Sequence, residues 1–342
     1  MEKNTVDDML TESAHNVLER HCTPQFVRTV EAARERNAGR ALWDQLDALG
    51  FLDALVPEEK GGSGMRLAAA AGALFEFGAH VLPLPAAHTM IARELLARAG
   101  VEAPRGPIAI ALGNASQHGA AFVPYGLVAD TLIVETTDGA SLVPLASAEL
   151  RAHGDSLDAM LTYPAHAARA LPATVRGVGE LGALATAATM AGGMQRIFDM
   201  TLGYVNDRQQ FGRSLGKFQA VQQQLSVMAE HVAATRVAAQ LGCAGHHTSG
   251  QRIAAAIAKA RASRAAPLVA NGAHALVGAM GITEEYDLQL HTRRLHAQRL
   301  QYGSESFWDD VVGTHAIDHW SSIAAGVIGI YDALDEAAAV AT

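Results

Sequence analysis

Residues 204–228 carry side chains whose types and spacing could bind a phosphorylated ligand. The segment is YVNDRQQFGRSLGKFQAVQQQLSVM, and its pattern predicts a helix that ends at Asp207-Arg208, a glycine-containing loop and a second helix that starts near Phe218. The Arg208 guanidinium would offer a planar fork to a diphosphate, and the Phe211 ring would offer a face to a flat or ribityl group. A plainer interpretation has Arg208 cap a helix C-terminus and Phe211 fill the inside of a bundle. Periodicity alone does not choose between the two interpretations.

Two other motifs match known fingerprints, but their surroundings argue against both. Residues 177–182 match GxGxxG, with Asp199 near the spacing of a ribose-binding acid. The βαβ unit that a dinucleotide fold requires does not follow, since the pattern continues as helix after helix. Residues 212–216 match GxSxG, yet that nucleophile elbow must join a strand to a helix, and the residues before it are typical of a helix end. We therefore expect neither a Rossmann domain nor a serine hydrolase.

Fifteen histidines raise the question of a metal site. His246 and His247 lie in a glycine-rich stretch, and His291 and His296 are five apart, off the spacing that puts two ligands on one helix face. Neither HExxH nor CxxC occurs. We expect solvated or capping histidines and no metal site.

The composition is that of an acidic, soluble protein. Of 342 residues, 49% are hydrophobic and 18% charged, which supports a buried interior, and the net charge of −9 argues against a nucleic-acid surface. Two cysteines, Cys22 and Cys243, fit a reducing compartment. No signal segment is recognised, and the longest uncharged runs, such as residues 181–195, are shorter than the ~20 apolar residues of a membrane span. We expect a cytoplasmic protein that binds neither nucleic acid nor membrane.

The hydrophobic pattern of the sequence changes twice along the chain, which predicts three domains. Residues 1–103 have helical periodicity, and residues 174–342 have it again, with long apolar stripes and short connections. Between them, residues 104–173 contain short apolar runs separated by Gly, Asp-Gly and Pro, with a hairpin turn expected at residues 137–140. The prediction is a mainly α fold with an N-terminal helical domain, a reduced middle β domain and a C-terminal four-helix bundle. Such bundles usually pair, so we expect a dimer or a tetramer.

Three segments, in order, resemble the acyl-CoA dehydrogenase family. The R-x-x-F-G helix end at residues 208–212, followed by F-Q-x-x-Q at 218–222, is similar to that family's signature. WDQLDALGFLDALVPEEKGGSG at 43–64 is similar to its N-terminal helical domain, including a V-P-E-x-x-G-G turn. HALVGAMGITEEYDLQLHTRR at 274–294 is similar to its C-terminal G-G-x-G element and the helix that follows. The order of helical, small-sheet and helical parts is also the family's.

The resemblance implies an FAD flavoprotein of fatty acid or steroid degradation. In the family a Glu carboxylate takes the α proton of an acyl-CoA, flavin N5 takes the β hydride, and an electron-accepting flavoprotein is the partner. The R-x-x-F-G loop and the G-G-x-G element hold the ADP half of a neighbouring subunit's FAD. The positions that match these elements are Arg208, Gln210, Phe211, Gly278, Ala279 and Gly281.

The chain departs from the family at both positions of the catalytic base. Tyr302 stands where the family's base precedes a G-T pair, and Gly182 occupies the alternative position on the first bundle helix. Tyr has an unperturbed pKa of about 10 and is a poor base for an α proton at neutral pH. Glu180 and Glu305 are nearby, but a neighbouring helix position points elsewhere. The catalytic residue is therefore unassigned.

The middle region departs as well. The family's T-E-P…G-S-D stretch and W-I-T strand, which cradle the flavin ring, have no match at residues 104–172, and the family glutamine before G-G-x-G is Ala275. The chain thus resembles the short, degenerate subunit of heteromeric acyl-CoA dehydrogenases, such as those acting on steroid-derived CoA thioesters. Two alternatives stay open: a self-sufficient homo-oligomer with a displaced Glu base, and a helical scaffold without flavin.

Overall fold

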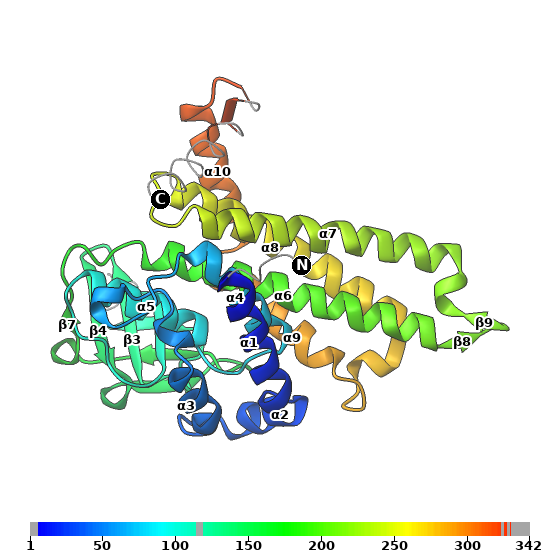
Figure 1. Cartoon of the computed structure of the whole chain (residues 1–342), viewed down its shortest axis with the longest axis horizontal. Helices are drawn as coiled ribbons and strands as arrows, with labels where there is room; N and C mark the ends of the chain where they lie inside the picture. The colour runs from blue at the N-terminus through cyan, green and yellow to red at the C-terminus, as the bar shows by residue number, and fades with distance from the viewer. Residues whose placement is uncertain (1–5, 114–118, 323–324, 327–328, 330–342) are drawn as a thin grey trace. The chain divides into compact units, whose positions relative to one another are not determined.

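The computed structural model describes residues 6–113, 119–322, 325, 326 and 329. Helices precede and follow a small β region along the chain, which confirms the predicted fold class (Figure 1).

The described chain forms two compact units. The first holds residues up to 77 and residues 82–185, and the second holds residues 78–81 and those from 186 onward. The division into three domains at residues 103 and 173 rests on the sequence pattern and stays a prediction.

The helices of the first unit bury their apolar stripes. Thr23 caps one of them by accepting a hydrogen bond from the Phe26 N–H, and Pro24 follows at its first position, where the missing N–H is harmless. A hydroxyl joins the helices to the β region, since Thr89 Oγ1 accepts from the Ile108 N–H at 2.8 Å. The helices are α1 Val6–His21, α2 Pro24–Ala33, α3 Arg40–Ala48, α4 Leu67–Ala79 and α5 Ala86–Arg98, with short 3-10 turns at Phe51–Asp53 and Glu58–Lys60.

The β region consists of two small sheets with a shared apolar core. One has the strand order β1-β3-β4-β7, in which β1 and β3 are parallel, and the other has the order β2-β6-β5. Their inward side chains, among them Leu132, Val143 and Leu161, are buried against one another. The strands are β1 Ile108–Leu112, β2 Ala120–Val123, β3 Thr131–Thr136, β4 Gly139–Pro144, β5 Glu149–Ala152, β6 Ala159–Thr162 and β7 Arg169–Ala170.

The hairpin expected near residues 137–140 is confirmed. β3 and β4 are antiparallel with Thr136 opposite Gly139, so the turn consists of Thr137 and Asp138. Gly139 has φ +123°, a conformation that a side chain would disfavour.

Long helices make up the second unit. α8 lies at its centre and packs against α7, α9 and α10. The elements are α6 Val178–Asp207, which begins in the first unit, β8 Gln209–Gln210, β9 Arg213–Ser214, the 3-10 turns η5 Leu215–Lys217 and η6 Gly278–Ile282, α7 Gln219–Ala244, α8 Gln251–Val277, α9 Leu288–Leu300 and α10 Glu305–His319.

One segment, residues 251–282, is long and apolar enough to cross a membrane by length and composition, contrary to our expectation from the uncharged runs. Close to half of its apolar window is buried inside the protein, and the segment contains the buried Lys259. These features are those of a core helix of a bundle.

Candidate functional site

The segment after α6 forms a tight β-hairpin rather than an irregular loop. α6 ends at Asp207, β8 and β9 pair with Gln210 opposite Arg213, and the Leu215 N–H extends the ladder by donating to the Arg208 carbonyl at 2.9 Å. Phe211 and Gly212 make the two-residue turn with φ values of +53° and +80°. Two successive positive φ values are typical of a type I′ turn, which matches the twist of the strands.

Phe211 lies at the tip of this hairpin and is 89% exposed. The interpretation that Phe211 fills the inside of the bundle is therefore wrong. Its ring makes an edge contact with Phe218 at 6.2 Å, and the Arg213 guanidinium lies 4.1 Å above the Phe218 ring. The left-handed backbone costs an L-residue about 1–2 kcal/mol, so neither burial nor backbone preference explains an aromatic side chain here.

Arg208 and Gln210 are also exposed: Arg208 lies between α6 and β8, and Gln210 is the last residue of β8. The hairpin therefore presents a guanidinium, an amide and an aromatic ring within four residues.

The second predicted segment, η6, is only partly open. Gly278 and Ala279 are exposed, and Gly278 has φ +71° with open space where a side chain would lie. Gly281 is buried: a Cβ there would be 3.0 Å from His274 Nδ1 and 3.1 Å from a Leu288 methyl carbon. Gly281 is thus needed for packing, and only the first two positions offer backbone to a ligand.

Both segments lie at the same end of the helical unit (Figure 1). Tyr286, just after η6, donates a hydrogen bond to the Met200 carbonyl at 2.8 Å. Its ring centroid is 5.8 Å from that of Tyr204, one helical turn before Arg208.

The turn between α9 and α10, where the family's base would lie, is closed. Tyr302 is 7% exposed with φ +57°. The Lys259 ammonium group, fully buried on α8, donates to the Arg299 carbonyl at 2.9 Å, the Gly303 carbonyl at 3.1 Å and Ser263 Oγ at 2.7 Å. Burial lowers the pKa of Lys259 to about 7, while Glu305 acts to raise it and Arg299 to lower it.

The ion pair of Glu305 argues against it as a displaced base. Glu305 receives two hydrogen bonds from Arg299, one of them from Nε at 3.1 Å, and this contact lowers the pKa of the carboxyl group. Glu180 lies half-buried in the first turn of α6, and Gly182 is buried one residue beyond Leu181. An ion-paired carboxylate with a lowered pKa is a weak proton acceptor.

Lys259 was missed by the sequence analysis. The sequence contains an indication that Lys259 is buried, because it lies in the alanine-rich stretch of residues 253–266, where Ala255, Ala256 and Ala262 are buried.

The two fingerprints rejected from the sequence have structural roles. Gly177 and Gly179 donate their N–H groups to the Glu135 carboxylate at 2.8 and 3.1 Å, so a side chain of the chain itself occupies the start of α6. Ser214 lies in the short strand β9, so the strand-to-helix elbow of a hydrolase is not formed.

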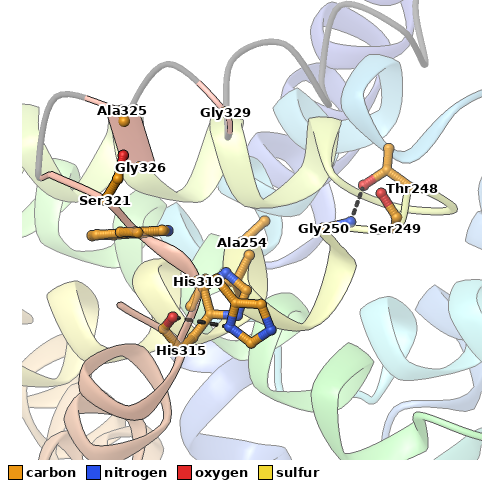
Figure 2. A pocket seen from close by; sticks show the side chains of 12 residues that line it. Thr248, Ser249, Gly250, Ala254, His315, His319, Ser321, Ala325, Gly326 and Gly329 are labelled. Carbon is orange, nitrogen blue, oxygen red and sulfur yellow. Dashed lines mark hydrogen bonds between the residues drawn. The ribbon is translucent and has the colours of Figure 1, made fainter. Parts of the chain in front are cut away.

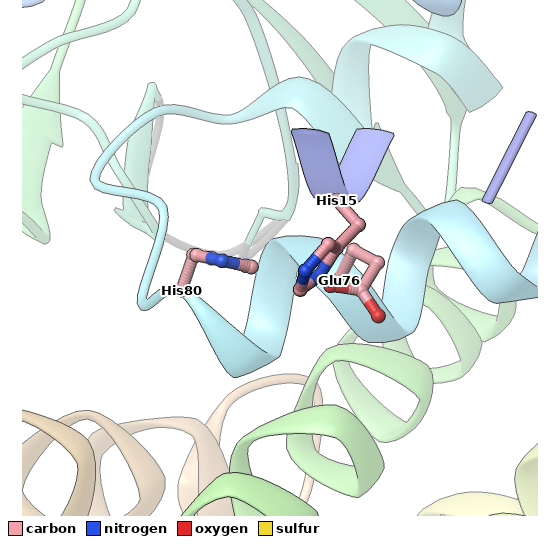
Figure 3. Close-up of side chains that lie close together, drawn as sticks. All are labelled: His15, Glu76 and His80. Carbon is pink, nitrogen blue, oxygen red and sulfur yellow. Dashed lines mark hydrogen bonds and ion pairs between the residues drawn. The ribbon is translucent and has the colours of Figure 1, made fainter. Parts of the chain in front are cut away.

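Not all histidines are solvated as expected. His291 is buried, and burial lowers its pKa to about 3, with Arg196, His80 and Arg294 adding to the effect. His15 on α1 donates to a Glu76 carboxylate oxygen on α4 at 3.0 Å, which is an ordinary bond between helices (Figure 3).

Comparisons with known proteins place these features in a family. The family model of the acyl-CoA dehydrogenase N-terminal domain matches residues 5–106, and that of the C-terminal domain matches residues 179–314. The acyl-CoA dehydrogenase IpdE2 of Mycolicibacterium smegmatis is 29% identical over 294 residues, which cover 84% of this chain and 92% of that protein.

Solved structures agree. A Tcur3481-Tcur3483 steroid ACAD variant superposes with a TM-score of 0.80 and 26% identity over 92% of this chain and 99% of that one. The ChsE4-ChsE5 complex from Mycobacterium tuberculosis has the same fold, with a TM-score of 0.79 and 21% identity over 94% of this chain and 100% of that one. The chain belongs to the acyl-CoA dehydrogenase family.

Proposed function

We propose that the chain is a subunit of a heteromeric acyl-CoA dehydrogenase and lends the hairpin after α6 to the FAD site of a complete partner subunit. The observation that carries the proposal is Phe211, an aromatic ring that is 89% exposed in a left-handed turn. Strain and exposure of this kind are maintained where the side chain has a binding role.

The side chains of the hairpin suit the ADP half of FAD. The Arg208 fork would neutralise the diphosphate with charge-assisted hydrogen bonds, Gln210 would add an amide, and the Phe211 ring would pack on a flat or ribityl group. Gly278 and Ala279 would let backbone approach from η6. FAD, when bound, supplies the hydride acceptor for α,β-dehydrogenation of an acyl-CoA thioester.

The base for the α proton would come from the partner subunit. Both family positions lack a carboxylate in this chain, and the nearby Glu305 is held by Arg299. A subunit that contributes only to its partner's FAD site needs the hairpin but does not need a catalytic base of its own.

The substrate class follows from the relatives. Because the similar solved structures include the steroid ACAD Tcur3481-Tcur3483, we place the substrate among steroid-derived CoA thioesters, with a separate flavoprotein as electron acceptor. Cys22 and Cys243 are both free and buried, which supports a cytoplasmic location.

The test is the flavin stoichiometry and acyl-CoA-dependent bleaching of the chain alone and with a complete acyl-CoA dehydrogenase subunit. We expect little FAD on the chain alone and a full, bleachable complement in the complex. Arg208→Ala should weaken FAD retention in the complex about tenfold or more, since a charge-assisted hydrogen bond contributes about 1.5–3 kcal/mol. The exposed Arg151→Ala is the matched control and should retain FAD normally.

Two outcomes would overturn the proposal. If the chain alone holds bleachable FAD and its Glu305→Gln variant loses turnover, the chain is a self-sufficient enzyme. A complex that holds no more flavin than the partner alone would make the chain a scaffold.

A further inference from the structure

The last turn of α10 carries two histidines that the family does not account for. His315 and His319 are four residues apart, a spacing that puts two side chains on one face of a helix. They lie just beyond residue 314, where the match to the family model ends. Figure 2 shows both imidazoles on the wall of a cavity.

The two rings are arranged as a pair. Their centroids are 4.4 Å apart and their planes differ by 17°. His319 Nδ1 lies 3.1 Å from the His315 carbonyl oxygen, and because a carbonyl can only accept, Nδ1 carries the proton. This leaves Nε2 of His319 with its lone pair, the arrangement by which a backbone carbonyl orients a metal-binding histidine.

The surroundings favour a cation over an anion. A surface cavity of about 580 Å³ is lined by both histidines together with Asp310, Asp318 and Arg252. Because an imidazole that binds a metal is neutral, two carboxylates face one guanidinium and the lining around a bound ion has a net charge of −1. A second cavity of about 310 Å³, also lined by His315 and His319, continues toward the first turn of α8.

We propose that His315 and His319 supply two imidazole ligands of a site for a divalent ion of the zinc class. Two Zn–N bonds of about 2.1 Å at a tetrahedral angle span about 3.4 Å between nitrogens, which is within reach of two side chains one helical turn apart. Imidazole suits zinc, copper and nickel. Water in the open cavity fills the remaining positions, so the ion keeps sites for a further ligand.

The test is calorimetric titration of Zn²⁺ into the full chain, without an affinity tag and freed of metal by a chelator. We expect one equivalent to bind, with at least a tenfold loss of affinity in His315→Gln and in His319→Gln. The double variant should lose little more than either single variant, since one ligand alone does not hold the ion. The exposed His166→Gln is the matched control and should bind as the wild type does.

Electron paramagnetic resonance of the Cu²⁺-loaded chain is a second readout that does not depend on affinity. The signal of two nitrogen ligands is expected in the wild type and should be lost in each single variant. The proposal is overturned if the wild type binds no Zn²⁺, if the double variant binds as tightly as the wild type, or if His166→Gln removes the site.

Discussion

Two turns of the second unit are alike in sequence and backbone and opposite in exposure. Phe211-Gly212 and Tyr302-Gly303 are each an aromatic residue followed by glycine, and all four residues have positive φ. Phe211 is 89% exposed, whereas Tyr302 is 7% exposed. The first turn belongs to the hairpin that we propose is lent to a partner, and the second lies where the family's base would stand.

The difference shows how one turn geometry serves opposite purposes. At Tyr302 the surrounding structure explains the strained backbone, because Lys259 binds the carbonyls on both sides of the turn. At Phe211 the described structure supplies a ladder below the turn and leaves the ring exposed. A strained turn that is closed contributes to stability, and one that is open is available to bind.

The largest effect is expected from removing the ammonium group that closes the second turn. Lys259→Ala removes the ammonium donor of the Gly303 carbonyl and leaves the Arg299 carbonyl with Ser263 Oγ as its side-chain donor, which we expect to lower the free energy of unfolding by about 2–5 kcal/mol. Lys259→Met keeps most of the volume and removes the desolvated charge, so it should cost less. Denaturant unfolding measures both variants.

The exposed Lys217→Ala is the control and should change little. If Lys259→Ala were as stable as Lys217→Ala, the turn would not depend on Lys259, and the contrast between the two turns would lose its cause.

The pH dependence of stability is the next test of the closed turn. Burial lowers the Lys259 pKa to about 7, whereas the unfolded chain has the ordinary value of about 10.4. Between these values the unfolded state binds more protons, so stability rises with pH by up to about 1.4 kcal/mol per pH unit. Below pH 7 both states are protonated and the contribution is constant.

Unfolding of the wild type and Lys259→Met from pH 6 to 9 isolates this contribution, because other groups titrate in both proteins. The difference between them should be flat below pH 7 and should favour the wild type increasingly above it. A difference that stays flat up to pH 9 would mean that the three acceptors keep the ammonium group charged.

Substitutions of Gly212 and Gly303 compare the two turns directly, with smaller expected losses of stability. Each Gly→Ala change forces an L-residue into positive φ, at about 1–2 kcal/mol. At Gly303 the added carbon would also lie 2.6 Å from a Phe307 ring carbon, whereas at Gly212 it would meet open space. Gly303→Ala should therefore lose more stability than Gly212→Ala in thermal unfolding. Equal losses would show that packing around the closed turn yields easily.

The parts that the sequence predicted are those with local causes. The β3–β4 hairpin follows from its Thr-Asp-Gly turn, and the end of α6 follows from the change in periodicity at Asp207. Turn chemistry and apolar spacing act within a few residues, so a single sequence contains them.

Features that depend on distant segments were not predicted. Phe211 was equally compatible with burial and exposure, because exposure depends on which helices cover the turn. The role of Lys259 depends on carbonyls about 40 residues further along the chain, which it reaches only after folding. The spacing of His315 and His319 is visible in the sequence, but the carbonyl that fixes the tautomer and the cavity beside it are not.

The smallest expected effect on stability tests the open turn most sharply. Asn-Gly is the preferred pair in a type I′ turn because Asn tolerates the left-handed conformation, so Phe211→Asn should leave stability unchanged or raise it by up to about 1 kcal/mol. The same change removes the exposed ring, so FAD retention in the assembled complex should fall. Thermal unfolding of the chain alone and flavin release from the complex measure the two effects separately. A variant that is more stable yet holds less flavin would show that Phe211 is kept for binding, whereas loss of stability with unchanged flavin would assign the ring to the fold and remove the contrast with Tyr302.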